Sequence, residues 1–244
     1  MRIAAGVYVL PIPRVPREAE GFLNLTLVLD AKNGNTLVDT GLPGQEEAIA
    51  SALADAGIGA RDLRRIILTH QDLDHVGSGA ALVRRSGARV MAHAADAPYI
   101  EGELRPLKVT PEMLERRPQM REVLERLEPV GVDERLEDTE RLELAGGIRV
   151  IFTPGHTPGH LSLYLERSKV LVAGDALTAE GGRLNGPNPS ATLDVREAAR
   201  SVRRLAELDV KTIVCYHGGV VGEDANGQLR RVVEETRGDA NRSG

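Results

Sequence analysis

Aromatic residues are scarce in this sequence: its 244 residues include no tryptophan, two phenylalanines and four tyrosines. Proteins that bind single-stranded nucleic acid stack the bases on such side chains, so this composition offers no stacking platform. The net charge of −5 provides no basic surface for a phosphate backbone. We therefore expect no nucleic-acid partner, and a core built from valine, leucine, isoleucine and alanine.

Cysteines and long apolar runs are also lacking. Cys215 is the one cysteine, which excludes an intramolecular disulfide and is compatible with a reducing compartment. No run approaches the roughly 18 apolar residues of a membrane-spanning helix. The short apolar run at the N-terminus is interrupted by prolines and has no small-residue cleavage site, so it predicts a strand rather than a signal peptide. We expect a cytoplasmic protein without a membrane partner; its oligomeric state stays open.

Strand and helix patterns alternate along the chain without a repeat or a long linker. Residues 23–29 show leucine at every second position, which indicates a strand, whereas residues 44–57 are typical of a helix closed by a glycine. From 94 to 127 the pattern becomes helical and charged, and Thr110 followed by Pro111 indicates a helix start. Strands return after about 131. This order predicts one α/β domain over residues 1–244, with sheets inside and helices outside.

Polar side chains follow several of the predicted strands directly. His70 follows "RIILT", His156 follows "VIFTPG", Asp175 follows "VLVAG", and His217 follows "TIVCY". Loops at strand ends are held by a rigid scaffold, so such positions often build sites. Imidazole and carboxylate are ligands of zinc, iron and manganese. The loop "THQDLDHVGSG" from Thr69 to Gly79 could wrap its own His70, Asp72, Asp74 and His75 around two adjacent ions.

The motifs "VDTG", "THQDLDHVG", "TPGHTPGH", "GD" and "YHGG" occur in this order over the whole chain, which resembles the metallo-β-lactamase superfamily. The resemblance implies a four-layered αββα sandwich with a metal site at one edge. It also implies two divalent ions, with zinc favoured and manganese or iron as alternatives. In the implied ligand set, His70, Asp72 and His156 hold the first ion, Asp74, His75 and His217 hold the second, and Asp175 bridges the two.

Asp72 departs from the usual family motif, H-x-H-x-D-H, which has histidine at this position. The sequence "HQDLDH" therefore resembles an HxDxDH variant subgroup of the superfamily. A carboxylate is a harder ligand than imidazole, so Asp72 favours manganese or iron relative to zinc. The flavodiiron branch, which carries glutamate here, supports this by analogy.

Three further residues have predicted supporting roles. Asp39 ends a predicted buried strand and, by the resemblance, orients the metal loop; metal-bound histidines usually have such a partner. His160 has no vacant ligand position to fill, so we expect it to brace the loop that carries His156. His93 ends another strand and is expected to be structural. Cys215 is expected to be a small buried residue rather than a ligand.

Possible contacts of the substrate are more loosely defined. Tyr216 lies beside His217 and could donate a hydrogen bond to a substrate oxygen. Asn188 and Ser190 lie in a polar, proline-rich loop that either borders the pocket or is a plain connector. Residues 94–127 form an insert that either caps the site or is a solvated outer pair of helices.

The resemblance favours a metal-dependent hydrolase. A hydroxide bridging two ions would attack the carbonyl carbon of a small-molecule ester, thioester or lactone, and Asp74 could take the proton. Three alternatives stay open: hydrolysis of a small phosphodiester, iron-dependent redox chemistry on the same fold, and a non-enzymatic binding module stabilised by metal. The family motifs specify the fold more strongly than the reaction.

Overall fold

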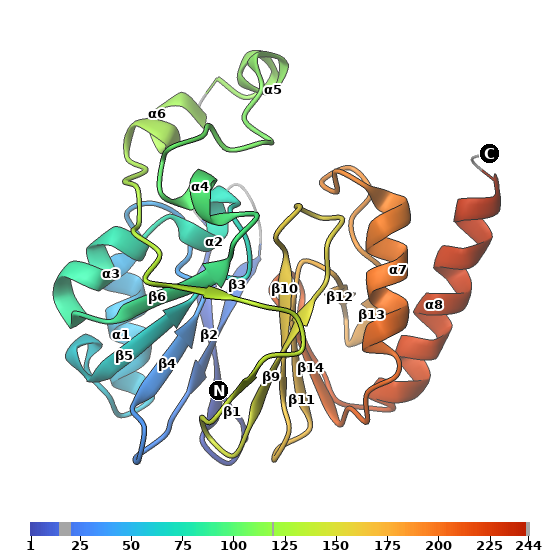
Figure 1. The fold of residues 1–244 in the computed structure, drawn as a ribbon, viewed down its shortest axis with the longest axis horizontal. Coiled ribbons are helices and arrows are strands. Elements are labelled where there is room, and N and C mark those ends of the chain that lie inside the picture. The colour runs from blue at the N-terminus through green and yellow to red at the C-terminus, as the bar shows by residue number, and fades with distance from the viewer. Residues whose placement is uncertain (15–20, 119, 243–244) are drawn as a thin grey trace.

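The computed structural model of the protein describes residues 1–14, 21–118 and 120–242, with side chains up to residue 236. Gln119, within the predicted insert, and residues 243–244, at the end of the predicted domain, lie outside this part. Two large sheets pack face to face, and helices cover both outer faces, so Figure 1 shows four layers. The predicted αββα architecture is confirmed.

The first sheet has seven strands in sequential order, and the chain runs antiparallel up to the β3–β4 pair and parallel from β4 onward. Its strands are β1 (Arg2–Ala4), β2 (Val7–Pro13), β3 (Phe22–Val28), β4 (Asn35–Val38), β5 (Leu63–Ile67), β6 (Arg89–His93) and β7 (Glu134–Leu136). The second sheet has six strands in the order β15-β14-β11-β10-β9-β8, and only β11 and β14 pair in parallel. These are β8 (Arg141–Leu142), β9 (Ile148–Phe152), β10 (Leu161–Leu165), β11 (Val170–Gly174), β14 (Thr212–Cys215) and β15 (Gly219–Val221).

The remaining elements are a small ribbon and the helices. The ribbon pairs β12 (Thr178–Glu180) with β13 (Arg183–Asn185). The α-helices are α1 (Glu46–Asp55), α2 (Leu73–Val76), α3 (Gly79–Ser86), α4 (Ala97–Ile100), α5 (Pro111–Arg116), α6 (Met120–Glu125), α7 (Val195–Leu205) and α8 (Ala225–Arg242), and a 3₁₀ helix spans Ala60–Asp62. None of the described helices is long and apolar enough to cross a membrane.

The core has three parts because strand side chains alternate between the two faces of a sheet. On β2, Val9 joins the apolar cluster between the two sheets, whereas Leu10 faces the helices on the outer side of the first sheet. Ile49 and Leu53 of α1 complete that outer cluster. A third cluster fills the space between the second sheet and helices α7 and α8. Each large apolar side chain buried in this way stabilises the fold by roughly 1.5–3 kcal/mol.

Asp30 connects the turns of the two sheets. Its carboxylate accepts hydrogen bonds from the amides of Lys32 and Asn33 in its own hairpin, at 2.9 and 3.0 Å, and from the Ala145 amide in the turn between β8 and β9, at 2.7 Å. Burial opposes ionisation, but these bonds hold the pKa of Asp30 well below its usual range. The charged carboxylate therefore ties the sheets together.

The insert at 94–127 contains α4, α5 and α6. Helix α5 begins at Pro111 as predicted, and the Thr110 hydroxyl accepts a hydrogen bond from the Met113 amide at 3.2 Å. Figure 1 shows α5 and α6 standing beyond the ends of the sheets, above α4 and α2. The insert therefore lies on the same side of the molecule as α2, which is part of the metal-loop motif.

Candidate metal centre

Strand ends bring the predicted site residues together. His70, His156, Asp175 and His217 come shortly after β5, β9, β11 and β14, respectively. Asp72, which directly precedes α2, lies with His70, His156 and Asp175 in one group whose ligand atoms are all within 4.8 Å of one another.

A second group meets the same criterion and consists of Asp74, His75 and His217. Asp175 lies between the two groups: its Oδ1 is 3.4 Å from His75 Nε2, and its Oδ2 is 3.3 Å from the Nε2 atoms of both His156 and His217. Asp74 Oδ2 is 3.3 Å from His217 Nε2. The structure thus assembles all seven predicted ligands, with one carboxylate facing both groups.

Asp39 and Thr69 orient two of the imidazoles. Asp39 Oδ2 lies 2.9 Å from His75 Nδ1, so this nitrogen donates to the carboxylate and Nε2 is directed towards Asp175. The Thr69 hydroxyl donates to Asp39, at 2.9 Å from Oδ2, and accepts from His70 Nδ1 at 3.0 Å. Asp39 is held at a φ of 63°, which is strained for a residue with a Cβ. This placement supports the predicted orienting role of Asp39.

His160 uses both of its ring nitrogens for structural contacts. Its Nε2 accepts a hydrogen bond from the Asp175 amide at 2.9 Å, and its Nδ1 lies 2.8 Å from the Thr153 hydroxyl. Burial lowers the pKa of His160 well below its usual value, which favours the neutral ring that these bonds require. A Cβ on Gly174 would lie 2.6 Å from His160 Nε2, so this approach requires glycine. His160 therefore positions Asp175.

The two groups leave buried polar atoms without hydrogen-bond partners. Among the described residues, five buried side-chain nitrogen or oxygen atoms have none, and three of them are His70 Nε2, His75 Nε2 and Asp175 Oδ1. Such atoms are costly in a folded protein unless a partner is supplied. His75 Nε2 and Asp175 Oδ1 lie 3.4 Å apart, and His70 Nε2 lies 3.3 Å from Asp72 Oδ2. A divalent cation satisfies imidazole and carboxylate lone pairs together. The residues present therefore fit metal binding.

The carboxylates of the site favour positive charge. Burial alone would lower the pKa of His217, but Asp175 and Asp74 raise it to about 9. The pKa of His75 is likewise raised well above its usual value despite burial, because Asp39 and Asp175 lie against the ring. A site with this many carboxylates would attract cations.

Lys108, which the sequence analysis missed, contributes a cation from the insert. Its Nζ lies 2.6 Å from Asp72 Oδ2 and 2.7 Å from His156 Nε2. Asp72 Oδ2 is in turn 3.0 Å from His156 Nε2 and 3.3 Å from His70 Nε2. In the sequence, Lys108 is one of many charged residues of the insert, and no local pattern distinguishes it.

Asp96, also missed, joins the two loops that carry the first group. This buried carboxylate accepts hydrogen bonds from the Gln71 amide at 3.0 Å, the Thr157 hydroxyl at 2.7 Å and the Gly159 amide at 2.7 Å. The Gln71 side chain accepts from the Leu107 amide at 3.0 Å. Asp96 follows β6 by three residues, so the strand-end pattern could have revealed it.

The position of Tyr216 differs from the expectation that its hydroxyl contacts the substrate. Its side chain is only 2% exposed, its hydroxyl donates to the Asp74 carbonyl, and its ring centroid lies 3.7 Å from that of His75. A substrate contact through this hydroxyl does not agree with that placement.

Cys215 is buried in the outer core of the second sheet, and burial raises the pKa of its thiol. The His93 ring stacks on Phe152 at 4.3 Å, which suits a structural role.

The loop after β13 touches the site through Thr192. The Thr192 hydroxyl lies 3.3 Å from His156 Nδ1 and donates to the Asn188 carbonyl at 2.8 Å. The Asn188 side chain accepts from the Ser190 hydroxyl at 2.8 Å. The substrate contacts expected of Asn188 and Ser190 stay predictions.

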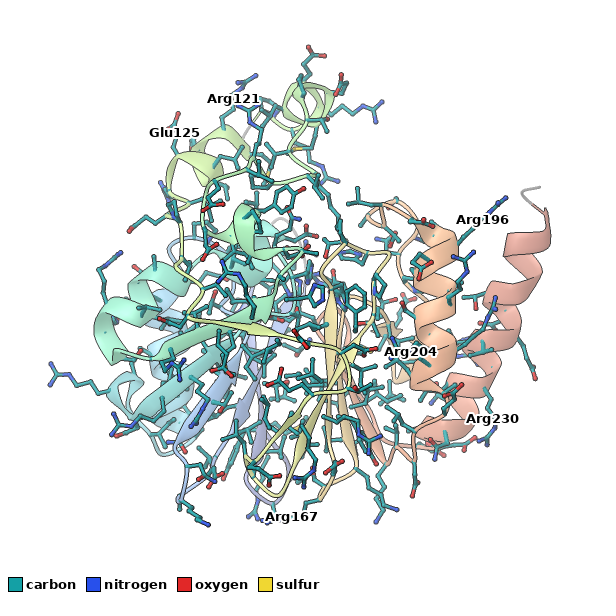
Figure 2. The ribbon with its side chains drawn as sticks, viewed as in Figure 1. Arg121, Glu125, Arg167, Arg196, Arg204 and Arg230 are labelled. Atoms are coloured by element: carbon teal, nitrogen blue, oxygen red, sulfur yellow. The ribbon has the colours of Figure 1, made fainter. Side chains whose placement is uncertain are left out.

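Helix α7 fixes the loop that carries His156. The Ser201 hydroxyl donates to the Pro154 carbonyl at 2.7 Å, and Arg204 donates to the Phe152 carbonyl at 2.7 Å. Figure 2 shows Arg204 on the side of α7 that faces the second sheet. Gly155 approaches α7 so closely that a Cβ there would lie 2.2 Å from the Ala198 nitrogen.

Comparison with known proteins identifies relatives over most of the chain. The family model described as metallo-beta-lactamase superfamily matches residues 20–217. A probable metallo-hydrolase of Bacillus subtilis, YflN, is 28% identical over 203 residues, which cover 75% of this chain and 74% of the relative. A hydroxyacylglutathione hydrolase of Mesorhizobium japonicum is 33% identical over 195 residues, and the match covers 78% of this chain but only 60% of the relative.

Solved structures share the fold. A metallo-beta-lactamase family protein of Thermus thermophilus superimposes with a TM-score of 0.78 at 28% identity, over 96% of this chain and 80% of that one. A subclass B3 metallo-beta-lactamase of Bradyrhizobium japonicum gives a TM-score of 0.68 at 20% identity, over 100% of this chain and 92% of that one. The second similarity concerns the fold alone.

Proposed function

Because the chain belongs to the metallo-β-lactamase superfamily, we propose that it is a hydrolase that uses two divalent metal ions to cleave a small-molecule ester, thioester or lactone. The observation that carries the proposal is the convergence of three unpartnered buried atoms, on His70, His75 and Asp175. They lie within two groups of side chains that contain only histidine and aspartate.

Each group would hold one ion. His70, Asp72 and His156 would hold the first, and Asp74, His75 and His217 the second. Asp175 would contribute to both, since its Oδ2 lies 3.3 Å from His156 of the first group and from His217 of the second. Zinc is the expected ion, with manganese or iron as alternatives because of Asp72. When bound, such ions lower the pKa of water and polarise a carbonyl group.

The chain's own groups would orient the ligands and move protons. Asp39 fixes His75 with Nε2 towards the site, and His160 fixes the backbone of Asp175. Asp74 is partly exposed beside His217, with 25% of its side chain accessible, so its carboxylate is placed to accept a proton during the reaction. The site is therefore pre-organised before any substrate enters.

Thioesters are the first substrate class to test. Relatives named hydroxyacylglutathione hydrolase are about one-third identical to this chain. The chain matches only about 60% of their length, so their substrate does not transfer directly.

The test measures hydrolysis of acyl thioesters, acyl esters and lactones by protein reconstituted with zinc, manganese or iron. A phosphodiester and an oxygen-consumption assay cover the two enzymatic alternatives. His75→Ala should abolish turnover, because it removes one ligand and frees Asp39. His93→Ala, outside the site, should retain it. Metal binding without turnover on any of these substrates would favour the non-enzymatic binding module.

A further inference from the structure

A cavity of about 400 Å³ lies under the insert. Its walls are mainly apolar: Leu104, Val109, Leu114 and Leu124 come from the insert, and Val76 comes from α2. Exposed charged residues also border it: Glu103 and Arg105 of the insert, and Glu128 directly after it. An apolar interior with a polar border, at this volume, is typical of a site for a small molecule.

The insert helices leave this apolar surface uncovered. Neither α5 nor α6 contains a buried residue, although both carry leucines. Figure 2 shows Arg121 and Glu125 extending from α6 towards the outside. Leu114 and Leu124, in contrast, line the cavity. The cavity is open to solvent on one side, so these leucines present an apolar surface that a ligand could cover.

The cavity adjoins the candidate metal centre through two connections. Gln71, which lines the cavity, lies in the chain between His70 and Asp72. Lys108 lies between two lining residues, Pro106 and Val109, and its Nζ contacts Asp72 Oδ2 at 2.6 Å. The cavity and the candidate metal centre therefore share a wall made of Gln71 and residues 106–109, although none of the seven proposed ligands lines the cavity.

We propose that this cavity binds the apolar acyl chain of the substrate, so that the enzyme prefers acyl groups with a medium-length alkyl chain to acetyl groups. The inference rests on the proposed hydrolysis for its substrate class. In that reaction water supplies the oxygen that joins the carbonyl carbon, the bond to the leaving sulfur or oxygen breaks, and the leaving group takes a proton. The carboxylic acid product would keep its chain in the cavity.

The protein has no tryptophan, so the fluorescence of a single introduced tryptophan can report ligand binding without any turnover. Leu104→Trp places a fluorescent reporter at the cavity, at a side chain that is 49% exposed. Leu107→Trp is the matched control: this residue is in the same segment and 36% exposed but does not line the cavity. Octanoate should shift the emission of the Leu104→Trp protein to shorter wavelength in a saturable way. Acetate should not, and neither ligand should shift the Leu107→Trp protein.

A second pair of variants tests the cavity wall. Leu124 lines the cavity and Val123 does not, although both are half-buried on α6. In the reporter background, Leu124→Asn should weaken octanoate binding about tenfold, and Val123→Asn should change it less than twofold. With octanoyl and acetyl esters or thioesters of one leaving group, each added methylene should raise kcat/KM by up to about fourfold.

The outcomes separate the two proposals. Octanoate binding at the cavity without hydrolysis of any acyl substrate would overturn the proposed function and support the cavity as a binding site for an acyl chain. Hydrolysis without octanoate binding and without a chain-length preference would overturn only the proposal that the cavity binds the acyl chain. Equal effects of Leu124→Asn and Val123→Asn on octanoate affinity would also overturn it.

Discussion

Lys108→Met should tighten binding of the first metal ion. The Lys108 ammonium donates to Asp72 Oδ2 at 2.6 Å and to His156 Nε2 at 2.7 Å, and both atoms belong to the first ligand group. An imidazole Nε2 has a single lone pair, which accepts either a proton donor or a metal ion. An ion bound by His156 must therefore displace Lys108 from this nitrogen.

The size of the effect follows from what the ion must displace. A hydrogen bond that involves a charged group contributes about 1.5–3 kcal/mol. Part of this is recovered when the ammonium returns to water, since 23% of the Lys108 side chain is already exposed. The remaining cost of roughly 1–2 kcal/mol corresponds to about a fivefold to thirtyfold change in affinity. Methionine keeps an unbranched chain against the insert but removes the charge.

Calorimetric titration of the metal-free protein with zinc, in the presence of a competing chelator, measures the zinc affinity of both sites. In Lys108→Met one of the two zinc affinities should rise by this factor, while the other changes little. Lys211→Met is the control, because it removes the same charge from an exposed position. Lys211 directly precedes β14, so it lies at the opposite end of that strand from the proposed ligand His217. Affinities of Lys108→Met within twofold of the wild type at both sites would refute the reasoning.

Three further changes test other parts of the structure. Asp175→Ala should lower kcat about a hundredfold or more by removing the carboxylate shared by both groups, whereas Cys215→Ser should lower stability but not kcat; equal losses of kcat would contradict this. Asp72→His should raise affinity for zinc relative to manganese in competition binding, and unchanged relative affinities would show that Asp72 does not set metal preference. Asp30→Asn should lower the free energy of unfolding at pH 7 by about 1 kcal/mol in urea titrations. Because the folded pKa of Asp30 is depressed, its contribution is complete above about pH 4 and declines as pH falls further, so the two proteins should converge in acid.

The strand-end pattern predicted much of the site. His70, His156, Asp175 and His217 are distant in sequence, yet each follows a strand. Loops that leave neighbouring strands at one edge of a sandwich must lie close together, so the pattern contained three-dimensional information. The division of the ligands into two groups came instead from the resemblance to the superfamily, because spacing alone does not pair residues of different loops.

Contacts from elements without a pattern could not be predicted. Lys108 is far in sequence from both Asp72 and His156, and its position depends on the path of the insert. Tyr216 failed as an expected substrate contact for a related reason. It precedes His217 directly, but neighbouring residues of an extended segment point to opposite sides, and its ring is buried against His75.

Buried hydrogen bonds couple the insert to the metal loops. Asp96 stands where the chain leaves β6 for the insert, and it accepts from Gln71 in one ligand loop and from Thr157 in the other. The Gln71 side chain in turn accepts from the Leu107 amide, next to Lys108. Each of these polar groups is costly to leave unpaired in the interior, so the loops and the insert are most stable together. A displacement of Lys108 by metal would therefore act on the segment that also forms the cavity wall. If the cavity binds the acyl chain as proposed, the insert would connect ion binding with substrate binding through Gln71.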